Sequence, residues 1–500
     1  MRVRRPAFLT IAAAVLLASC ATPTNEVRVG SKKFTESVVL GEILAQRERA
    51  AGVAARHRAQ LGGTQILWHA LLAGDIDMYP EYTGTIRQDI LHEAAGAPGG
   101  DLREALARHG VGMSGSFGFE DRYALGMKSS DATRLGVRRI SDLRAHPGLR
   151  LGFSEEFLHR GDGWPAVKTR YGLPHAGVRP LDHDLAYRAL AAGDIDAMDL
   201  YTTDAEIPYY DMVVLDDDLD AFPEYQAVVL YRLDLAERVP AALPPVRELT
   251  GRITAEQMRR LNARVKLERV PETTAAADFL ATTLRIEREP AAEGPARRVG
   301  RAIAEHLSLV AASLGAAVVV AIPLGIVAAR RRRMGAAILA VAGVIQTIPT
   351  LALLVFLIPV LGIGAGSAVA ALFLYSVLPI VTNTMAGLAG IPAPLLESAD
   401  VLGLSRRARL WRIELPLASP SILAGVQTSA VINVGTATLG ALIGAGGLGQ
   451  PIVTGIRLDD MRLILEGAVP AALLALIVQA LFAWLARGLV PRGLRLRPED

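Results

Sequence analysis

Cysteine is almost absent from this chain of 500 residues, since the single copy is Cys20. One thiol cannot form an internal disulfide, so a disulfide framework is excluded. The sequence also lacks the pattern Gly-x-x-x-x-Gly-Lys-Ser/Thr, so the chain is not expected to bind ATP through a phosphate-binding loop. The histidines do not have the spacing of metal ligands, and we expect neither a metal nor a cofactor.

The sequence also contains no recognisable catalytic motif. The nearest approach to a nucleophile elbow is Gly112-Met113-Ser114-Gly115, in which the spacing is wrong. The pair Glu155 and Glu156 has no partner acid that the sequence identifies. We therefore expect no catalytic residues and no enzyme.

Lysine is missing from the second part of the chain. Residues 1–299 contain every lysine and 41 of the 50 acidic residues. From residue 300 onward there are 15 arginines, nine acidic residues and long apolar runs. This division predicts a soluble domain at 27–288, a linker at 289–303 and a polytopic membrane domain at 304–490.

The first residues have the pattern of a secretory signal. Arg2, Arg4 and Arg5 precede an apolar stretch over 7–18, which is too short to span a bilayer well. The stretch ends in Leu-Ala-Ser before Cys20, which resembles a bacterial lipobox, in which the cysteine is lipidated and becomes the mature N-terminus. The alternative is an ordinary signal with an incidental cysteine. Either way, residues 1–20 place the next domain outside the cytoplasmic membrane.

Five apolar runs in the second part are long enough to cross a hydrocarbon core of about 30 Å. They lie at about 305–329, 335–361, 366–388, 421–444 and 464–486. The second run is long and contains Pro349, so it is expected to form either one span or two shorter helices, giving about five to six transmembrane helices.

Arginine placement predicts the orientation of these spans. Twelve arginines follow the first, third and fifth runs, and five crossings put all of them on one side. Only Arg301, Arg457 and Arg462 fall on the other side. The arginine-rich loops are therefore expected in the cytoplasm and residue 300 outside, which agrees with the signal.

One of these loops, 389–420, has a specific pattern. It resembles the coupling loop of ABC importer permeases, with Ser398 in place of the family's first Ala; the matching positions are Glu397, Ala399, Gly403, Ile413, Leu415 and Pro416. The resemblance implies a short helix that docks in a groove of a separate cytoplasmic ATPase. The alternative is an ordinary basic loop.

The soluble part alternates strand-like and helix-like segments, which suits an α/β domain. The sequence Ala-Gly-Asp-Ile-Asp occurs at 73–77 and again at 192–196. This echo predicts two lobes of similar organisation, with the second lobe at about 122–222 and a cleft between the lobes.

Two phrases in this part, 30–36 and 79–85, read Gly-Ser-Lys-Lys-Phe-Thr-Glu and Tyr-Pro-Glu-Tyr-Thr-Gly-Thr. They resemble the periplasmic binding proteins for glycine betaine, choline and carnitine, although Lys33 stands where that family often has Asn or Asp. The resemblance implies a box of tyrosines around a quaternary ammonium, at Tyr82, Tyr123, Tyr201 and Tyr225. It also implies that Asp121 adds negative charge, and that the ligand's carboxylate meets Lys32, Thr85 and Arg160.

Each of these residues has an ordinary alternative role. A tyrosine in a globular domain is often packed for stability, and Lys32 can be solvated. Arg160 can pair with Glu155, Glu156 or Asp162. Glu36 and Asp204 can cap helices or join the lobes.

The sequence thus predicts a two-lobed α/β binding domain fused to an all-α ABC permease domain in the bacterial inner membrane. We expect an importer subunit for glycine betaine, choline or carnitine, with a separate ATPase and with two copies of this chain in the transporter. The alternatives are an importer of another trimethylammonium or amino-acid-like solute, and a membrane-bound solute sensor. Nucleic acid is not an expected partner.

Overall fold

The computed structural model describes residues 25–92, 101–287 and 294–489. The signal at 1–20, with Cys20, lies outside the described residues. The described residues form two compact units, one made essentially of residues 25–287 and one of the residues from 294 onward. Helix α15 of the second unit begins at Pro295, inside the range expected for the linker.

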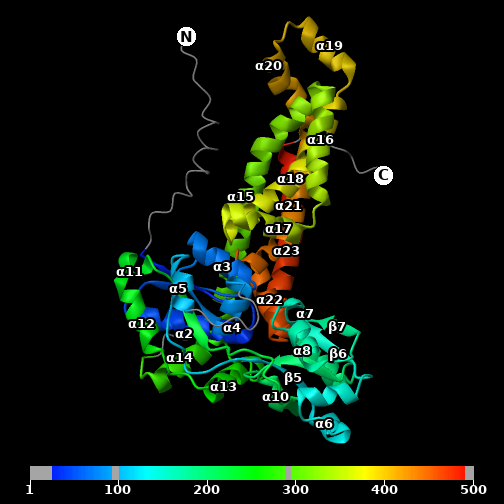
Figure 1. Cartoon of the computed structure of the whole chain (residues 1–500). Helices are drawn as coiled ribbons and strands as arrows, with labels where there is room; N and C mark the ends of the chain where they lie inside the picture. The colour runs from blue at the N-terminus through cyan, green and yellow to red at the C-terminus, as the bar shows by residue number, and fades with distance from the viewer. Residues whose placement is uncertain (1–24, 93–100, 288–293, 490–500) are drawn as a thin grey trace. The chain divides into compact units, whose positions relative to one another are not determined.

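The first unit contains two five-stranded sheets with matching topology (Figure 1). In each sheet, three neighbouring strands run parallel, and the fourth strand pairs antiparallel with both the third and the fifth. The first sheet has the order β2 (Ala55–Arg58), β1 (Val27–Gly30), β3 (Met78–Tyr82), β10 (Ala227–Arg232) and β4 (Val111–Met113). The second has the order β7 (Val178–Leu181), β6 (Leu151–Ser154), β8 (Ala197–Tyr201), β5 (Tyr123–Lys128) and β9 (Met212–Val214).

Helices and short turns connect the strands of this unit. They are α2 (Thr35–Ala50), α3 (Thr64–Ala73), α4 (Thr83–Thr85), η1 (Ile86–Ile90), α5 (Leu102–Ala107), α6 (Ser129–Leu135), η2 (Ile140–Ala145), α7 (Glu155–His159), α8 (Trp164–Tyr171), α9 (His183–Ala192), α10 (Glu206–Tyr209), α11 (Leu235–Arg238), η3 (Pro240–Ala242), α12 (Leu243–Glu248), α13 (Ala255–Lys266) and α14 (Glu272–Thr283). The chain passes between the lobes twice, from β4 to β5 and from β9 to β10.

The echoed pentapeptide has the same structure in both lobes. Gly74 ends α3 at φ 77°, and Gly193 ends α9 at φ 80°; both lie in the left-handed region that glycine adopts without strain. The isoleucine that follows is buried in each lobe. The prediction of two lobes with similar α/β organisation is therefore confirmed.

The last aspartate of each pentapeptide is bound by an arginine at the start of a parallel strand. Arg28 donates its backbone N–H to Asp77 Oδ2 at 2.8 Å and its guanidinium Nε to the same oxygen at 2.9 Å. Arg150 donates to Asp196 in the same manner, at 2.7 and 3.0 Å. These pairs join the start of β3 to β1 and the start of β8 to β6.

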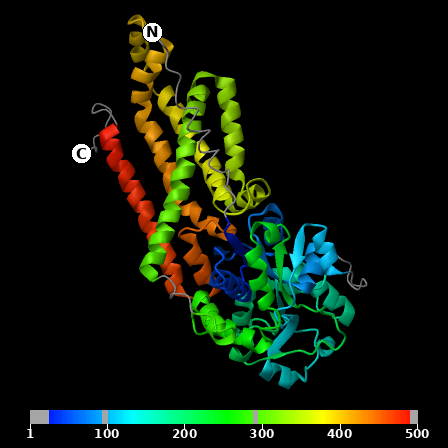
Figure 2. The same cartoon turned by 90° about the vertical axis from the view of Figure 1, so that its left-hand side faces the viewer.

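Every secondary-structure element among the described residues of the second unit is a helix (Figure 2). Its elements are α15 (Pro295–Arg330), α16 (Arg332–Thr347), α17 (Thr350–Leu361), α18 (Ala365–Ala389), α19 (Ala393–Val401), α20 (Arg406–Arg409), η4 (Leu410–Glu414), α21 (Leu415–Thr436), η5 (Ala437–Ile443), α22 (Gly449–Arg457) and α23 (Met461–Leu489). Helices α15, α18 and α21 pack against one another. Small residues permit the close approach, since a Cβ on Gly325 would lie 2.6 Å from Thr384 and one on Gly425 would lie 2.7 Å from Asn383.

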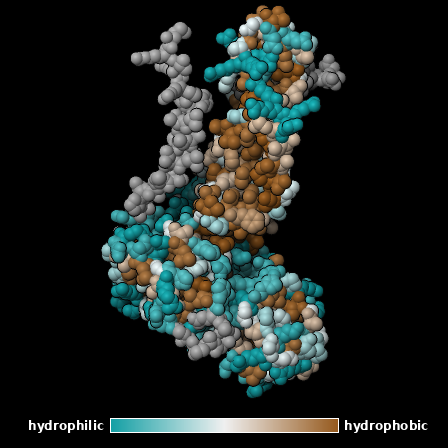
Figure 3. Space-filling model, turned by 45° about the horizontal axis from the view of Figure 1, so that its top comes forward, coloured by the Kyte–Doolittle hydropathy of each residue, from teal (hydrophilic) through white to brown (hydrophobic). Residues whose placement is uncertain are grey.

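Four helical stretches among the described residues are long and apolar enough to cross a membrane: α15, α18, the stretch from Arg406 to Ile443, and α23. Helices α16 and α17 together make a fifth candidate, bent by 101° at the break that contains Pro349. The run at 335–361 therefore forms two shorter helices, which confirms the second of the two predictions made for it, one span or two shorter helices. Figure 3 shows hydrophobic residues over the middle of the long helices and hydrophilic residues around α19 and α20.

Candidate ligand site and coupling loop

Three of the four tyrosines singled out from the sequence lie at ends of strands, and the fourth lies close to the start of one. Tyr82 is the last residue of β3, Tyr201 is the last of β8, and Tyr123 is the first of β5. Tyr225 comes two residues before β10. Tyr123 and Tyr201 are direct cross-strand partners, and Ala227 pairs with Tyr82. Strand pairing thus brings together residues that are far apart in the sequence.

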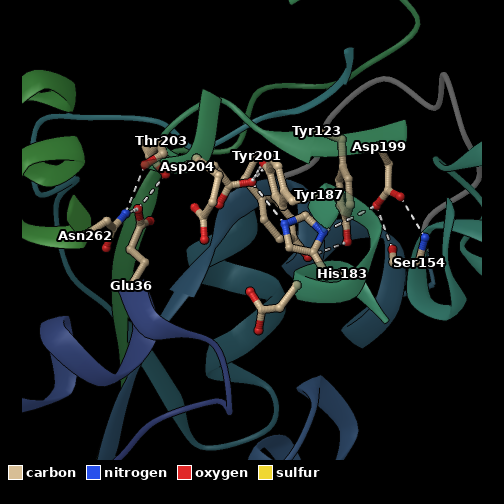
Figure 4. Close-up of polar contacts among 12 residues, drawn as sticks. Glu36, Tyr123, Ser154, His183, Tyr187, Asp199, Tyr201, Thr203, Asp204 and Asn262 are labelled. Atoms are coloured by element: carbon tan, nitrogen blue, oxygen red, sulfur yellow. Dashed lines mark hydrogen bonds and ion pairs between the residues drawn. The ribbon is translucent and has the colours of Figure 1, made fainter. Parts of the chain in front are cut away.

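Three of the tyrosines form one cluster of rings. The ring centroids of Tyr123 and Tyr201 are 4.9 Å apart, and their hydroxyl oxygens are 3.2 Å apart (Figure 4). Tyr225 meets the Tyr123 ring edge-on at 5.8 Å. Gly84 makes room for Tyr225, because a Cβ at this position would lie 2.4 Å from the Tyr225 ring.

Phe34 links the fourth tyrosine to this cluster. Its ring centroid is 6.2 Å from that of Tyr82 and 5.9 Å from that of Tyr201, and the Phe34 and Tyr201 planes are inclined by 24°. Phe157 packs at 5.2 Å from Tyr123. Both phenylalanines were missed as site residues. Phe34 could have been found, because it lies inside the Lys-Phe-Thr-Glu phrase.

Lys32 lies beside Tyr82 and is ion-paired. Its Nζ donates to Glu81 Oε1 at 2.6 Å and lies 5.9 Å from the centroid of the Tyr82 ring. Burial raises the pKa of Glu81, although Lys32 opposes the shift. Thr85 is buried in α4.

Arg160 is also ion-paired, and it lies against the tyrosine rings. Its guanidinium donates twice to Asp162, at 2.9 Å each, and once to Asp89 at 2.5 Å. Its central carbon is 5.3 Å from the Tyr123 centroid and 5.9 Å from the Tyr225 centroid. Pairing with Asp162 was one of the alternatives left open by the sequence, whereas pairing with Asp89 was not foreseen.

Acidic side chains are buried behind the rings. Asp121 accepts from the backbone N–H of Thr203 at 3.2 Å, and burial raises the pKa of its carboxyl well above the usual range, with Glu36 and Asp204 adding to the effect. Glu36 accepts from the hydroxyl of Tyr82 at 2.6 Å. Two buried acids therefore adjoin the tyrosine cluster, and positive charge brought close to them would favour their ionised forms.

A histidine packs on one of the box tyrosines. The ring centroids of His183 and Tyr201 are 4.6 Å apart, and His183 Nε2 lies 3.0 Å from Asp204 Oδ2. The same oxygen accepts from Tyr187 and from the backbone N–H of Tyr201 (Figure 4). Burial disfavours the imidazolium, but Asp204 and Asp199 raise the pKa of His183 well above its usual value. The sequence offered no reason to single out His183, because its histidines lack the spacing of metal ligands.

In the second unit, the loop that resembles a coupling loop forms the short helix α19 and its exit. Ala399 is buried, whereas Glu397 is exposed. Gly403 has φ 70°, in the left-handed region, and open space surrounds the position of a Cβ. Val401 and Leu402 are 89% and 77% exposed, which leaves an apolar end of the helix without cover in the described residues. Ile413 and Pro416 follow in η4 and the first turn of α21.

Comparisons with known proteins agree with this division. Residues 25–282 match the family model for the substrate-binding domain of ABC-type glycine betaine transport systems. Residues 321–494 match the model for the inner-membrane component of binding-protein-dependent transport systems.

Two relatives resemble the second unit. The choline transport system permease protein OpuBB of Bacillus subtilis is 44% identical over 193 residues, which cover 38% of this chain and 88% of that protein. The osmoprotectant import permease protein OsmY of Salmonella typhimurium is 44% identical over 188 residues, which cover 37% and 80%. A solved glycine betaine/carnitine/choline ABC transporter structure is similar to the first unit, with 28% identity and a TM-score of 0.44, and covers 52% of this chain and all of that one.

The two units together define a component of a binding-protein-dependent importer, in which the solute-binding domain and the membrane permease are one chain. The chain belongs to the ABC-type glycine betaine transport family, whose permease members include choline, carnitine and osmoprotectant systems.

Proposed function

We propose that this chain imports a quaternary-ammonium solute, namely glycine betaine, choline or carnitine. The binding domain captures the solute outside the cytoplasmic membrane and delivers it to the permease domain of the same chain. A separate cytoplasmic ATPase supplies the energy, and two copies of the chain form the pathway. We propose that the binding domain comprises residues 27–288, that the permease domain comprises residues 304–490, and that the loop 389–420 lies in the cytoplasm.

The observation that carries this proposal is the cluster of tyrosine rings at the strand ends. A trimethylammonium group has no hydrogen to donate, so it is held by the faces of aromatic rings. Each good cation–π contact contributes about 0.5–2 kcal/mol. The contacts of Arg160 with Tyr123 and Tyr225 support the assignment, because they are already cation–π contacts at this position.

The carboxylate of glycine betaine or carnitine is assigned to Lys32, Thr85 and Arg160. Lys32 and Arg160 lie on the ring cluster, and an arginine fork suits a carboxylate. Both cations are bound to protein carboxylates, so a ligand carboxylate has to share or displace these partners. Choline, which has no carboxylate, does not need this exchange.

The test is binding of radiolabelled choline, glycine betaine and carnitine to the full chain in lipid nanodiscs. We expect binding of at least one of the three, and a loss of about tenfold or more in Tyr123→Ala, since one ring contact of about 0.5–2 kcal/mol and its packing are removed. Tyr209→Ala is the matched control, because Tyr209 is 64% exposed and outside the ring cluster. Normal binding by a folded Tyr123→Ala protein would reject the tyrosine box. Binding of amino acids alone would reject the solute class.

A further inference from the structure

Glu36 is a buried carboxylate that receives three hydrogen bonds. Its Oε1 accepts from the hydroxyl of Tyr82 at 2.6 Å. Its Oε2 accepts from the hydroxyl of Thr203 at 2.6 Å and from the amide of Asn262 at 3.0 Å (Figure 4). The residue lies in the first turn of α2 and is 3% exposed.

These three donors come from different parts of the binding domain. Tyr82 is the box tyrosine of the first sheet, and Thr203 comes two residues after the box residue Tyr201 of the second sheet. Asn262 belongs to α13 and also donates to the backbone carbonyl of Thr203, at 3.1 Å. One carboxylate therefore fixes residues of both lobes at the edge of the ring cluster.

The ionised form fits these contacts best. A carboxylate accepts at both oxygens, whereas a protonated carboxyl needs one donor to turn away. Burial nevertheless raises the pKa of Glu36 to about 7, against the opposing effect of the bonds from Thr203, Tyr82 and Asn262.

The charged groups around Glu36 do not compensate its charge. Asp204 raises its pKa further, and Asp121 is a second buried acid that interacts with it. Lys266 of α13 pairs instead with Asp184 and Glu206. No ion pair to Glu36 occurs among the described residues of either lobe.

We infer that Glu36 is a positioning residue of the ligand site, and that binding of a solute cation is coupled to release of a proton from Glu36. The ionised carboxylate holds Tyr82 and Thr203 in place, and the ligand's trimethylammonium supplies the compensating charge. This inference rests on the proposed function, since it assumes that the cation binds at the tyrosine rings.

The sign of the pH effect follows from this coupling. A bound cation favours the ionised form, so the pKa of Glu36 is lower in the complex than in the free protein. Above the free-state pKa of about 7, Glu36 is already ionised and its proton no longer affects the affinity. Below it, binding has to release the proton, and the dissociation constant rises by up to about tenfold per pH unit.

The experiment measures binding of radiolabelled choline to the full chain in nanodiscs between about pH 5.5 and 8.5, a range that brackets the titration. Wild type should bind less tightly as the pH falls below about 7. Glu36→Gln cannot titrate and carries no negative charge, so it should bind choline about tenfold less tightly than wild type at high pH. Its affinity should not change as the pH falls, because the proton-linked step is removed.

Two further variants separate coupling from simple structural support. Glu48→Gln is the matched control, because Glu48 is also buried in α2, burial raises its pKa to about 8, and it lies outside the ring cluster. Its pH profile should equal that of wild type. Thr203→Val removes one hydrogen bond that favours the carboxylate, so the onset of the slope should move to higher pH.

A flat wild-type profile, or an unchanged slope in Glu36→Gln, would overturn the inference. If Glu36→Gln fails to fold, two measurements still test the inference: the pH dependence of choline affinity in wild type, and the pH at which this dependence begins in Thr203→Val. Failure of wild type to bind any quaternary ammonium at any pH would instead reject the proposed function.

Discussion

At the scale of the residue, the two basic side chains at the ring cluster already form ion pairs with carboxylates of the protein. Arg160 is bound to Asp162 and Asp89 while lying on two tyrosine rings. Lys32 is bound to Glu81. The preference among solutes should therefore depend on how easily these ion pairs open.

The first prediction concerns Arg160→Ala. Glycine betaine should bind about tenfold less tightly, because a charge-assisted hydrogen bond contributes roughly 1.5–3 kcal/mol. Choline should bind as well as in wild type or better, because Asp162 and Asp89 lose their partner and add negative charge. Competition of the two solutes on the same preparation measures the ratio, with the exposed Arg179→Ala as control. Equal losses for both solutes would remove Arg160 from the carboxylate site.

The second prediction concerns Gly84→Ala. The added methyl would lie 2.4 Å from the ring of Tyr225, so this ring has to move. Overpacking of this kind typically costs about 1–3 kcal/mol, and here it displaces a box wall. Choline affinity should fall about tenfold or more for such a cost, whereas Gly177→Ala, at a position with open space, should leave affinity unchanged. Calorimetric titration checks both variants, and full affinity in Gly84→Ala would show that Tyr225 is not needed.

At the scale of the element, α19 and its exit form the part proposed to contact the ATPase. Gly403 allows the sharp turn at φ 70°, and the apolar residues Val401 and Leu402 stand exposed beside it. A non-glycine residue in this conformation costs about 1–2 kcal/mol. The added side chain also enters the surface that the partner is proposed to cover.

The third prediction is therefore that Gly403→Asp lowers solute-stimulated ATP hydrolysis and uptake together in vesicles that contain the partner ATPase. Choline binding should stay normal, because the variant lies in the other unit. Ser398→Ala is the control, since it restores the family's own residue in the same helix and removes only a hydroxyl that bonds to the carbonyl of Pro394. Normal uptake by Gly403→Asp would reject the coupling-loop assignment.

At the scale of the whole molecule, fusion ties one receptor to each permease domain. Two copies of the chain would thus carry two receptors for one pathway. If the linker is short and flexible, as proposed, the effective concentration of the receptor is roughly in the millimolar range. On this proposal, the rate of transport depends less on how much binding protein is present than it would if the binding domain were a separate protein.

The fourth prediction concerns the anchor at Cys20. Cys20→Ala should abolish incorporation of labelled palmitate and leave the signal poorly processed. Transport should persist, because four or five apolar helical stretches hold the second unit in the membrane. Metabolic labelling followed by immunoprecipitation makes the measurement. If wild type takes up no label, the segment is an ordinary or an uncleaved signal.

The sequence by itself determined the division into two units and their classes. Spacing of apolar residues is a local property, so the runs around Pro349 and the two Ala-Gly-Asp-Ile-Asp segments predicted the broken helix pair and the repeated lobe. The family resemblance also gave Tyr82, Tyr123, Tyr201 and Tyr225 as candidates. Three of them lie at strand ends, and Tyr225 lies two residues before β10.

Only the tertiary structure decided how the charges of the site are paired. Lys32 and Glu81 are 49 positions apart, Arg160 and Asp89 are 71 apart, and Glu36 and Thr203 are 167 apart. No local pattern relates such residues, because their contacts depend on the order of strands in each sheet and on the passage of the chain between lobes. The roles of Phe34, His183 and Glu36 emerge from the same cause: burial and hydrogen bonding arise when distant strand ends meet.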